Sequence, residues 1–184
     1  MRCFDLILSA LGLVLLAPLF IGVVLVSLIF QPGSPLYLQG RVGRDEKPFT
    51  LIKFRTMRPE TQTVGTHEVN PGQVTAWGAL LRRLKFDELP QLWNVLKGEM
   101  SLVGPRPCLP NQTDLIAARR KLFVFSVRPG ITGLAQIQGI DMSTPELLAK
   151  TDAEMIRTMS LGGYFKYIFL TVCGWGRGDR VRLG

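Results

Sequence analysis

The chain has 184 residues, a formal net charge of +8 and 47% hydrophobic residues. This length accommodates one domain with its own core, and the charge favours anionic partners such as nucleic acid, phosphate esters or an anionic membrane surface. The three cysteines are widely separated and the single histidine is His67. These counts exclude a disulfide framework and a metal centre built from cysteine or histidine.

The first part of the chain is apolar, with no charged residue from Leu6 to Phe30. As one helix this stretch would span roughly 37 Å, which is enough to cross a bilayer. Ala17 and Pro18 lie in its middle and predict a kink, because proline lacks a backbone donor and its ring clashes with the preceding turn. Two arrangements follow: a kinked transmembrane span, or a re-entrant helix–break–helix with both ends on one face. The residues alone favour the span, and the cations from Arg41 to Arg58 favour a cytoplasmic main body.

Residues 31–40 are rich in turn-forming types and predict an irregular exit from the apolar segment. Residues 49–57 predict a short strand, with a hairpin across residues 44–48. On such a strand Lys53 and Arg55 would share one face. In isolation, cations in this pattern are typical of a solvated strand edge.

Helical periodicity dominates the rest of the chain. Residues 80–84 combine an apolar stripe with basic neighbours, which predicts an amphipathic helix at a membrane surface. A second stripe occupies residues 89–96, and further helices are predicted at 111–126 and 145–159. The apolar run at 164–173 is too short to span a bilayer and fits an interfacial or core segment.

These elements predict an α/β, mostly helical protein. A membrane helix at residues 1–30 would precede a membrane-associated body at 31–184, with interfacial amphipathic helices around a small cytoplasmic domain. The pattern shows no internal repeat and no second domain within that body.

Two short segments indicate chemistry. Asp87 and Glu88 follow a basic run, and Pro90 suits the first turn of a helix, so Asp87 is predicted as the helix N-cap and Glu88 as its first residue. Further on, the stiff loop around Arg106, which has a proline on each side, presents one guanidinium. Together they suggest a metal-assisted phosphate site. Taken singly, the acid pair is more often a helix cap, and the glycine-rich segment after Arg128 is either a phosphate cradle or a turn.

Several longer motifs occur in an order that resembles one known family. They are Lys53-Phe-Arg-Thr-Met57, Leu81-Arg-Arg83, Asp87-Glu-Leu-Pro-Gln91, Asn94-Val-Leu-Lys-Gly98, Met100-Ser-Leu-Val-Gly-Pro-Arg-Pro107 and Arg128-Pro-Gly-Ile-Thr-Gly-Leu-Ala-Gln136. With these motifs the chain resembles the monotopic phosphoglycosyl transferases, the bacterial sugar transferases that start lipid-linked glycan assembly. The match extends from the apolar segment to about Asp152.

The resemblance implies a reaction and roles for the motif residues. A sugar-1-phosphate would move from a UDP-sugar to a polyprenyl (undecaprenyl) phosphate, with release of UMP. Asp87 would be the nucleophile that carries a covalent phosphosugar, and Mg²⁺ would bind at Asp87 and Glu88. Glu88 would be the second catalytic residue, which either supports the metal or acts on the incoming lipid phosphate. Cationic side chains would hold the phosphates, namely Lys53, Arg55, Arg83, Arg106 and Arg128.

The resemblance also implies a topology and a set of partners. The apolar segment would be re-entrant and broken at Ala17 and Pro18, with Arg2 meeting anionic headgroups on the cytoplasmic face of the bacterial inner membrane. A UDP-sugar, a polyprenyl phosphate and membrane lipid are the expected partners; no nucleic acid is expected, and a homodimer is left open. The alternative function is a basic, membrane-anchored binding or scaffold protein without catalysis. The sequence does not name the sugar.

Overall fold

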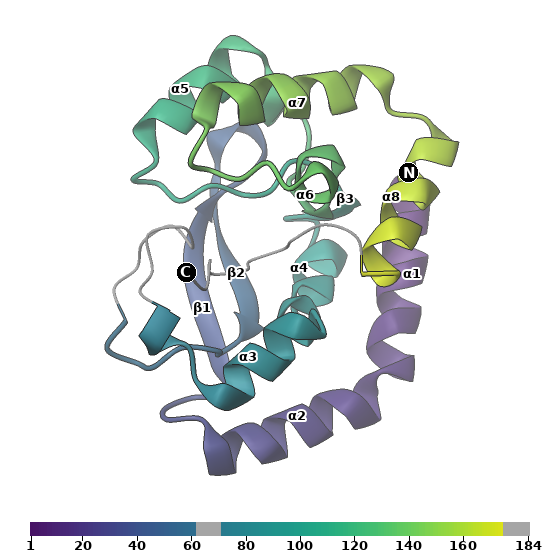
Figure 1. Ribbon diagram of the computed structural model, residues 1–184. Helices are drawn as coiled ribbons and strands as arrows, with labels where there is room; N and C mark the ends of the chain where they lie inside the picture. The colour runs from purple at the N-terminus through teal and green to yellow at the C-terminus, as the bar shows by residue number, and fades with distance from the viewer. Residues whose placement is uncertain (62–70, 175–184) are drawn as a thin grey trace.

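The computed structural model describes residues 1–61 and 71–174, so His67 lies outside the described part of the chain. Within those ranges the protein is α/β and mostly helical, as predicted, with two sheets of two strands each. The elements in chain order are α1 (Arg2–Leu15), α2 (Ala17–Phe30), β1 (Leu36–Val42), η1 (Arg44–Glu46), β2 (Pro48–Phe54), η3 (Pro71–Gln73), α3 (Ala76–Arg83), η4 (Phe86–Glu88), α4 (Gln91–Lys97), β3 (Ser101–Val103), α5 (Thr113–Lys121), η5 (Val124–Ser126), β4 (Gly130–Thr132), α6 (Leu134–Gln138), α7 (Pro145–Thr158) and α8 (Leu161–Val172), where η denotes a 3₁₀ turn. In Figure 1, α1 follows one side of the molecule, α2 crosses the base, and α5 and α7 lie at the opposite end from α2.

The apolar segment is a bent pair of helices. α1 and α2 meet at Leu16, immediately before Ala17 and Pro18, and the two helices are bent by 59°. The predicted kink is confirmed. Among the described residues no single helix is long and apolar enough to cross a bilayer, whereas this bent pair passes that test as a unit. Its most exposed apolar side chains are Ile7, Leu11, Val14, Leu15, Ile21, Leu25, Leu28, Ile29 and Phe30.

β1 and β2 form the predicted hairpin, paired antiparallel along their whole length. The prediction that residues 31–40 are irregular is wrong for the second half, because β1 begins at Leu36. β1 directs two polar side chains, Gln39 and Arg41, into the interior. Its sequence therefore lacks the buried apolar alternation by which strands are recognised.

The second sheet pairs β3 with β4 in parallel, with Ser101 opposite Gly130. The backbones approach so closely that a Cβ atom on Gly130 would lie 2.0 Å from the amide nitrogen of Gly104. The segment after Arg128, for which the sequence left two alternatives, therefore contains a short buried strand, and its first glycine is required by this close approach.

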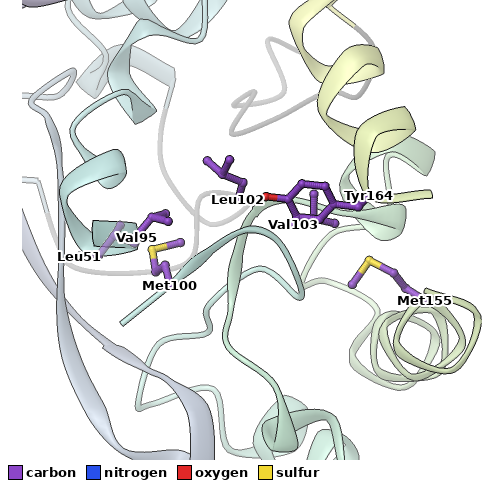
Figure 2. Packing of buried hydrophobic residues seen from close by; sticks show 7 residues of the cluster. All are labelled: Leu51, Val95, Met100, Leu102, Val103, Met155 and Tyr164. Atoms are coloured by element: carbon purple, nitrogen blue, oxygen red, sulfur yellow. The ribbon is translucent and has the colours of Figure 1, made fainter. Parts of the chain in front are cut away.

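Three apolar clusters hold the elements together. The largest joins β2, α4, β3, α7 and α8 (Figure 2). A second lies among α5, α6 and α7, and a third connects α2 with β2 and α3. The third cluster is built on Val23, Phe54 and Leu81, so the apolar helix α2 shares a core with the rest of the protein.

Of the two later helices predicted at 145–159 and 111–126, the first has nearly the predicted bounds and the second does not. α7 occupies Pro145–Thr158, as predicted to within one residue. The predicted helix at 111–126 is instead split, because α5 ends at Lys121 and Phe123 adopts a left-handed backbone with φ of 56° before η5. A bulky residue in that conformation interrupts a right-handed helix.

Candidate active site

The acid pair lies on a tight turn between α3 and α4. The chain reverses at Lys85, whose φ is 58°, and Asp87 and Glu88 follow within η4. The prediction that these two residues begin a helix is wrong, since α4 begins only after Pro90. Proline has no N–H with which to continue a helical hydrogen-bond ladder from η4, so the turn and the helix remain separate.

Glu88 is joined to Arg106 by a short ion pair. Arg106 Nη2 lies 2.9 Å from Glu88 Oε1, and the two side chains are 20% and 13% exposed. Asp87, the neighbour of Glu88 in the turn, is 3% exposed. A charge-assisted hydrogen bond between two side chains that are mostly buried helps to fix the orientation of the guanidinium. The structure thus brings together the acid pair and the arginine of the Pro-Arg-Pro loop.

Lys53 and Arg55 lie over the same aromatic ring. Lys53 Nζ is 5.7 Å and Arg55 Cζ is 5.5 Å from the centroid of the Tyr37 ring, so the two cations share a face as predicted. Arg55 also donates from Nε to the carbonyl of Ser34 at 2.8 Å. Lys53 is buried, and its strand β2 packs against η4. Lys53 therefore belongs to the strand that adjoins the acid pair.

Asn94 fixes the distance between that strand and α4. Its Nδ2 donates to the carbonyl of Thr50 at 2.7 Å, and its Oδ1 accepts from the amide of Ile52 at 3.0 Å. Both bonds reach β2 from a side chain that is fully buried. This amide therefore ties the strand that contains Lys53 to the helix that begins three residues after Glu88.

The two remaining predicted cations are Arg83 and Arg128. Arg83 is exposed at the end of α3. Its neighbour Arg82 donates from Nε to Thr56 Oγ1 at 2.8 Å. Arg128 donates from Nε to the carbonyl of Gly98 at 2.8 Å, which places it at the C-terminal end of α4, where a cation is favoured by the helix dipole. Their role in binding phosphate stays a prediction, because α3 packs against η4 and a Cβ atom on Gly104 would lie 2.5 Å from the carbonyl oxygen of Arg128.

The sequence did not predict that two arginines, Arg119 and Arg41, are buried. Arg119, predicted only as part of a basic helix, is 1% exposed and pairs with Asp152 on α7 at 2.7 Å. Burial raises the pKa of Asp152, and the nearby charge of Arg119 opposes that rise. The available signal was spacing, since Leu115 precedes Arg119 by one helical turn and is also buried. Arg41 gives no such signal, because it lies in an unrecognised strand.

The carboxylates can be compared with what magnesium requires. In the described ranges no group of three or more His, Cys, Asp or Glu side chains is arranged to hold a metal ion. Mg²⁺ is commonly bound by one or two carboxylates, with substrate phosphates and water completing its shell. The adjacent carboxylates of Asp87 and Glu88 fit that donor set.

A comparison with known proteins identifies the group to which these features correspond. The family model described as bacterial sugar transferase matches residues 1–177. The chain is 38% identical to a UDP-glucose:undecaprenyl-phosphate glucose-1-phosphate transferase of Caulobacter vibrioides, over 93% of this chain and 67% of the relative. A transferase of that same description from Escherichia coli is 39% identical, over 93% of this chain and 39% of the relative.

A third relative carries a different sugar in its name. The UDP-N-acetylgalactosamine-undecaprenyl-phosphate N-acetylgalactosaminephosphotransferase of Aeromonas hydrophila is 32% identical, over 93% of this chain and 42% of the relative. The chain therefore spans less than half the length of two of these three relatives. Their names share the nucleotide and the lipid acceptor but differ in the sugar.

Proposed function

The chain belongs to the bacterial sugar transferase family, and from that premise we propose that it transfers a sugar-1-phosphate from a UDP-sugar to a polyprenyl phosphate, with release of UMP. The observation that carries the proposal is the joining of the acid pair to Arg106, at 2.9 Å between Glu88 and the guanidinium. A nucleophilic carboxylate beside a fixed cation suits transfer of a phosphoryl group. Undecaprenyl phosphate, named for the relatives, is the proposed lipid acceptor.

The proposed reaction has two displacements at one phosphorus atom. A carboxylate oxygen of Asp87 attacks the β-phosphorus, the bond from that phosphorus to the bridging oxygen breaks, and UMP leaves. A phosphate oxygen of the polyprenyl phosphate then attacks the same phosphorus and releases the carboxylate of Asp87. The product is a polyprenyl diphosphate sugar, and neither step requires a proton donor.

Arg106 and Lys53 supply positive charge in this scheme. The planar guanidinium of Arg106 can hold two phosphate oxygens, and Glu88 orients it before the substrate binds. Lys53, on the strand beside η4, adds a second cation. Asp87 and Glu88 would hold Mg²⁺, which when bound neutralises diphosphate charge and polarises the leaving group.

We also propose that α1 and α2 form a re-entrant unit that enters and leaves the inner membrane from the cytoplasmic face. Support comes from the two ends of the pair, which are bonded to the same body. Asp5, in the first turn of α1, accepts hydrogen bonds from the amide of Leu102 at 2.9 Å and from the hydroxyl of Tyr164 at 2.8 Å. At the other end, Gln31 donates to the carbonyl of Met57 at 2.8 Å. A straight span would separate these ends by roughly 40 Å.

Arg2 has a role in the fold that was not predicted. Its guanidinium donates to the carbonyls of Val95 at 2.8 Å and Leu96 at 3.2 Å, at the C-terminal end of α4. The expectation that Arg2 also meets lipid headgroups stays a prediction. The contact ties the first residues of α1 to the helix that follows the acid pair.

A binding or scaffold protein without catalysis is the alternative function. Such a protein has no requirement for a buried aspartate next to a glutamate held by arginine. Burying a carboxylate carries a large desolvation cost, which catalytic sites commonly bear. The placement of Asp87 and Glu88 therefore favours the transferase.

The experiment that tests the function uses the Asp87→Asn variant. With a panel of UDP-sugars, undecaprenyl phosphate and Mg²⁺, the wild type should release UMP with at least one sugar, and Asp87→Asn should release essentially none. Intact-mass analysis with the UDP-sugar alone should show a phosphosugar adduct on the wild type and none on the variant. The amide is nearly isosteric with the carboxylate, so the variant should retain the thermal stability of the wild type.

Two outcomes would refute parts of this proposal. Near-normal turnover by Asp87→Asn would exclude Asp87 as the nucleophile, and lipid binding without UMP release from any UDP-sugar would favour the scaffold. In the same assay excess EDTA should stop UMP release and added Mg²⁺ should restore it. An unchanged rate in EDTA would remove the metal from the proposed site.

A further inference from the structure

The Pro-Arg-Pro loop is anchored almost entirely through its carbonyl groups. Pro105 and Pro107 have no N–H, so the loop has few donors of its own. Four consecutive carbonyls each accept a hydrogen bond from outside the loop. The pairs are Pro105 with the amide of Gly130 at 2.9 Å, Arg106 with Arg119 Nη1 at 2.8 Å, Pro107 with Arg41 Nη1 at 2.8 Å, and Cys108 with the amide of Val42 at 3.0 Å.

The two arginine donors are built alike. Arg119 donates from Nε and Nη2 to Asp152 Oδ2, at 3.0 and 2.7 Å. Arg41 donates from the same two atoms to Gln39 Oε1, at 3.1 and 2.6 Å. In each case the third nitrogen, Nη1, remains directed at a loop carbonyl. The rigid fork of arginine makes this division of donors possible, and a lysine could not reproduce it.

Stability alone does not account for the pair of Arg119 and Asp152. Arg119 is 1% exposed and Asp152 is fully buried, and burial raises the pKa of the carboxyl group. Replacing a buried ion pair by apolar residues of similar volume is often neutral or stabilising. What an apolar pair would lack is a donor aimed at the carbonyl of Arg106.

We propose that Arg119 and Arg41 are positioning residues for the transferase reaction: they hold the loop backbone so that the Arg106 guanidinium stays fixed at the phosphate site. Asp152 and Gln39 orient these two arginines. The inference rests on the proposed function, because it assigns the loop geometry to catalysis. Loss of this geometry should reduce turnover more than substrate binding, since a misplaced catalytic group acts chiefly on the transition state.

The primary test is Arg119→Lys, with Arg120→Lys as the matched control. Arg120 lies next to Arg119 on α5, but it is exposed and pairs with Glu46. Arg119→Lys should lower kcat about 10- to 100-fold while changing KM for the UDP-sugar by less than about threefold. Arg120→Lys should leave both constants near those of the wild type. An unchanged kcat in a folded Arg119→Lys variant would overturn the proposal.

A double-mutant cycle distinguishes positioning from a general loss of structure. If Arg119 acts through Arg106, then Arg106→Lys combined with Arg119→Lys should be little slower than Arg106→Lys alone. If the kcat losses of the two single variants multiply in the double variant, the two residues act independently, and the proposal is rejected. If Arg119→Lys fails to fold, the combination of Arg119→Met with Asp152→Leu removes both buried charges. That variant should fold and show the same loss of kcat, and a normal kcat in it would equally reject the proposal.

A second readout does not depend on activity. Cys108 follows the loop and is fully buried, whereas Cys3 and Cys173 are exposed. With Cys3 and Cys173 replaced by serine, Arg119→Lys should accelerate labelling of Cys108 by a maleimide at least about tenfold, and Arg120→Lys should not. If the wild type releases UMP from no UDP-sugar, the proposed function fails, while the labelling still decides whether Arg119 holds the loop. Equal labelling rates would show that it does not.

Discussion

Glu88 and Arg106 form the contact on which the candidate site depends. The carboxylate is part of the η4 turn and the guanidinium belongs to a loop whose backbone cannot supply many donors. The ion pair between them is only partly exposed to water, so it helps to orient both side chains. This arrangement assigns Arg106 a geometric role that charge alone would not fill.

Arg106→Lys tests that role at the scale of one residue. The substitution keeps the positive charge and removes the planar fork, so we expect a loss of about 1–3 kcal/mol in transition-state stabilisation, measured from kcat/KM with the preferred UDP-sugar. Arg120→Lys provides the control for the same chemical change at an exposed position. Equal kcat/KM values for Arg106→Lys and the wild type would show that a point charge is sufficient.

At the scale of elements, the short parallel sheet connects the loop to the rest of the fold. β3 leads into the loop and β4 lies directly against it, with the amide of Gly104 donating to the carbonyl of Thr132 at 2.8 Å. The closeness of these strands requires a residue without a side chain at Gly130. The hairpin of β1 and β2 supplies Arg41 to the same loop.

Gly130→Ala should separate these strands. The added Cβ would lie 2.0 Å from the amide nitrogen and 2.5 Å from the Cα of Gly104, and backbone atoms cannot yield as a flexible side chain would. We expect a loss of about 3 kcal/mol or more in the free energy of unfolding, measured by thermal or denaturant unfolding in detergent. Gly40→Ala is the matched control on β1, since no atom lies within 4 Å of its added Cβ. A Gly130→Ala variant as stable as Gly40→Ala would contradict the observed packing.

At the scale of the whole molecule, α1 and α2 are fastened to the body at both ends. α1 lies beside α8, where Phe4 and Phe165 pack edge to face with centroids 5.2 Å apart (Figure 1). Tyr164 on α8 donates to Asp5, and burial, followed by this hydrogen bond, raises the pKa of the phenol. The phenol therefore remains protonated and able to donate at neutral pH.

The native Cys3 reports which face of the membrane the first turn of α1 occupies. It is exposed, so in a Cys173→Ser background an impermeant maleimide can be applied to inverted vesicles and to spheroplasts. The re-entrant arrangement predicts labelling in inverted vesicles only. Labelling from the periplasmic side would reject it and favour a kinked span.

Two further variants separate the bend from the attachments. Pro18→Leu restores a backbone donor, but the bonds of Arg2 and Asp5 to the body oppose straightening. We expect Cys3 to change sides only when Pro18→Leu is combined with Asp5→Leu.

Features decided by neighbouring residues could be read from the sequence. The break beside Pro18, the β1–β2 hairpin turn and the extent of α7 all follow from backbone chemistry within a few residues. The motifs containing Asp87 and Arg106 were also sufficient to indicate the family and its chemistry. The separation of η4 from α4 was missed, although Pro90 gave a local reason for it.

Only the tertiary structure decided which distant groups meet. Arg106 bonds Glu88 across 18 positions, Arg119 bonds Asp152 across 33, and Tyr164 bonds Asp5 across 159. Local periodicity records whether a face is apolar, and it does not record which buried cation will find which buried acceptor. The burial of Arg119 and Arg41 was not predicted for this reason: Asp152 lies on α7, and the loop carbonyls to which both arginines donate reach them only when the chain is folded.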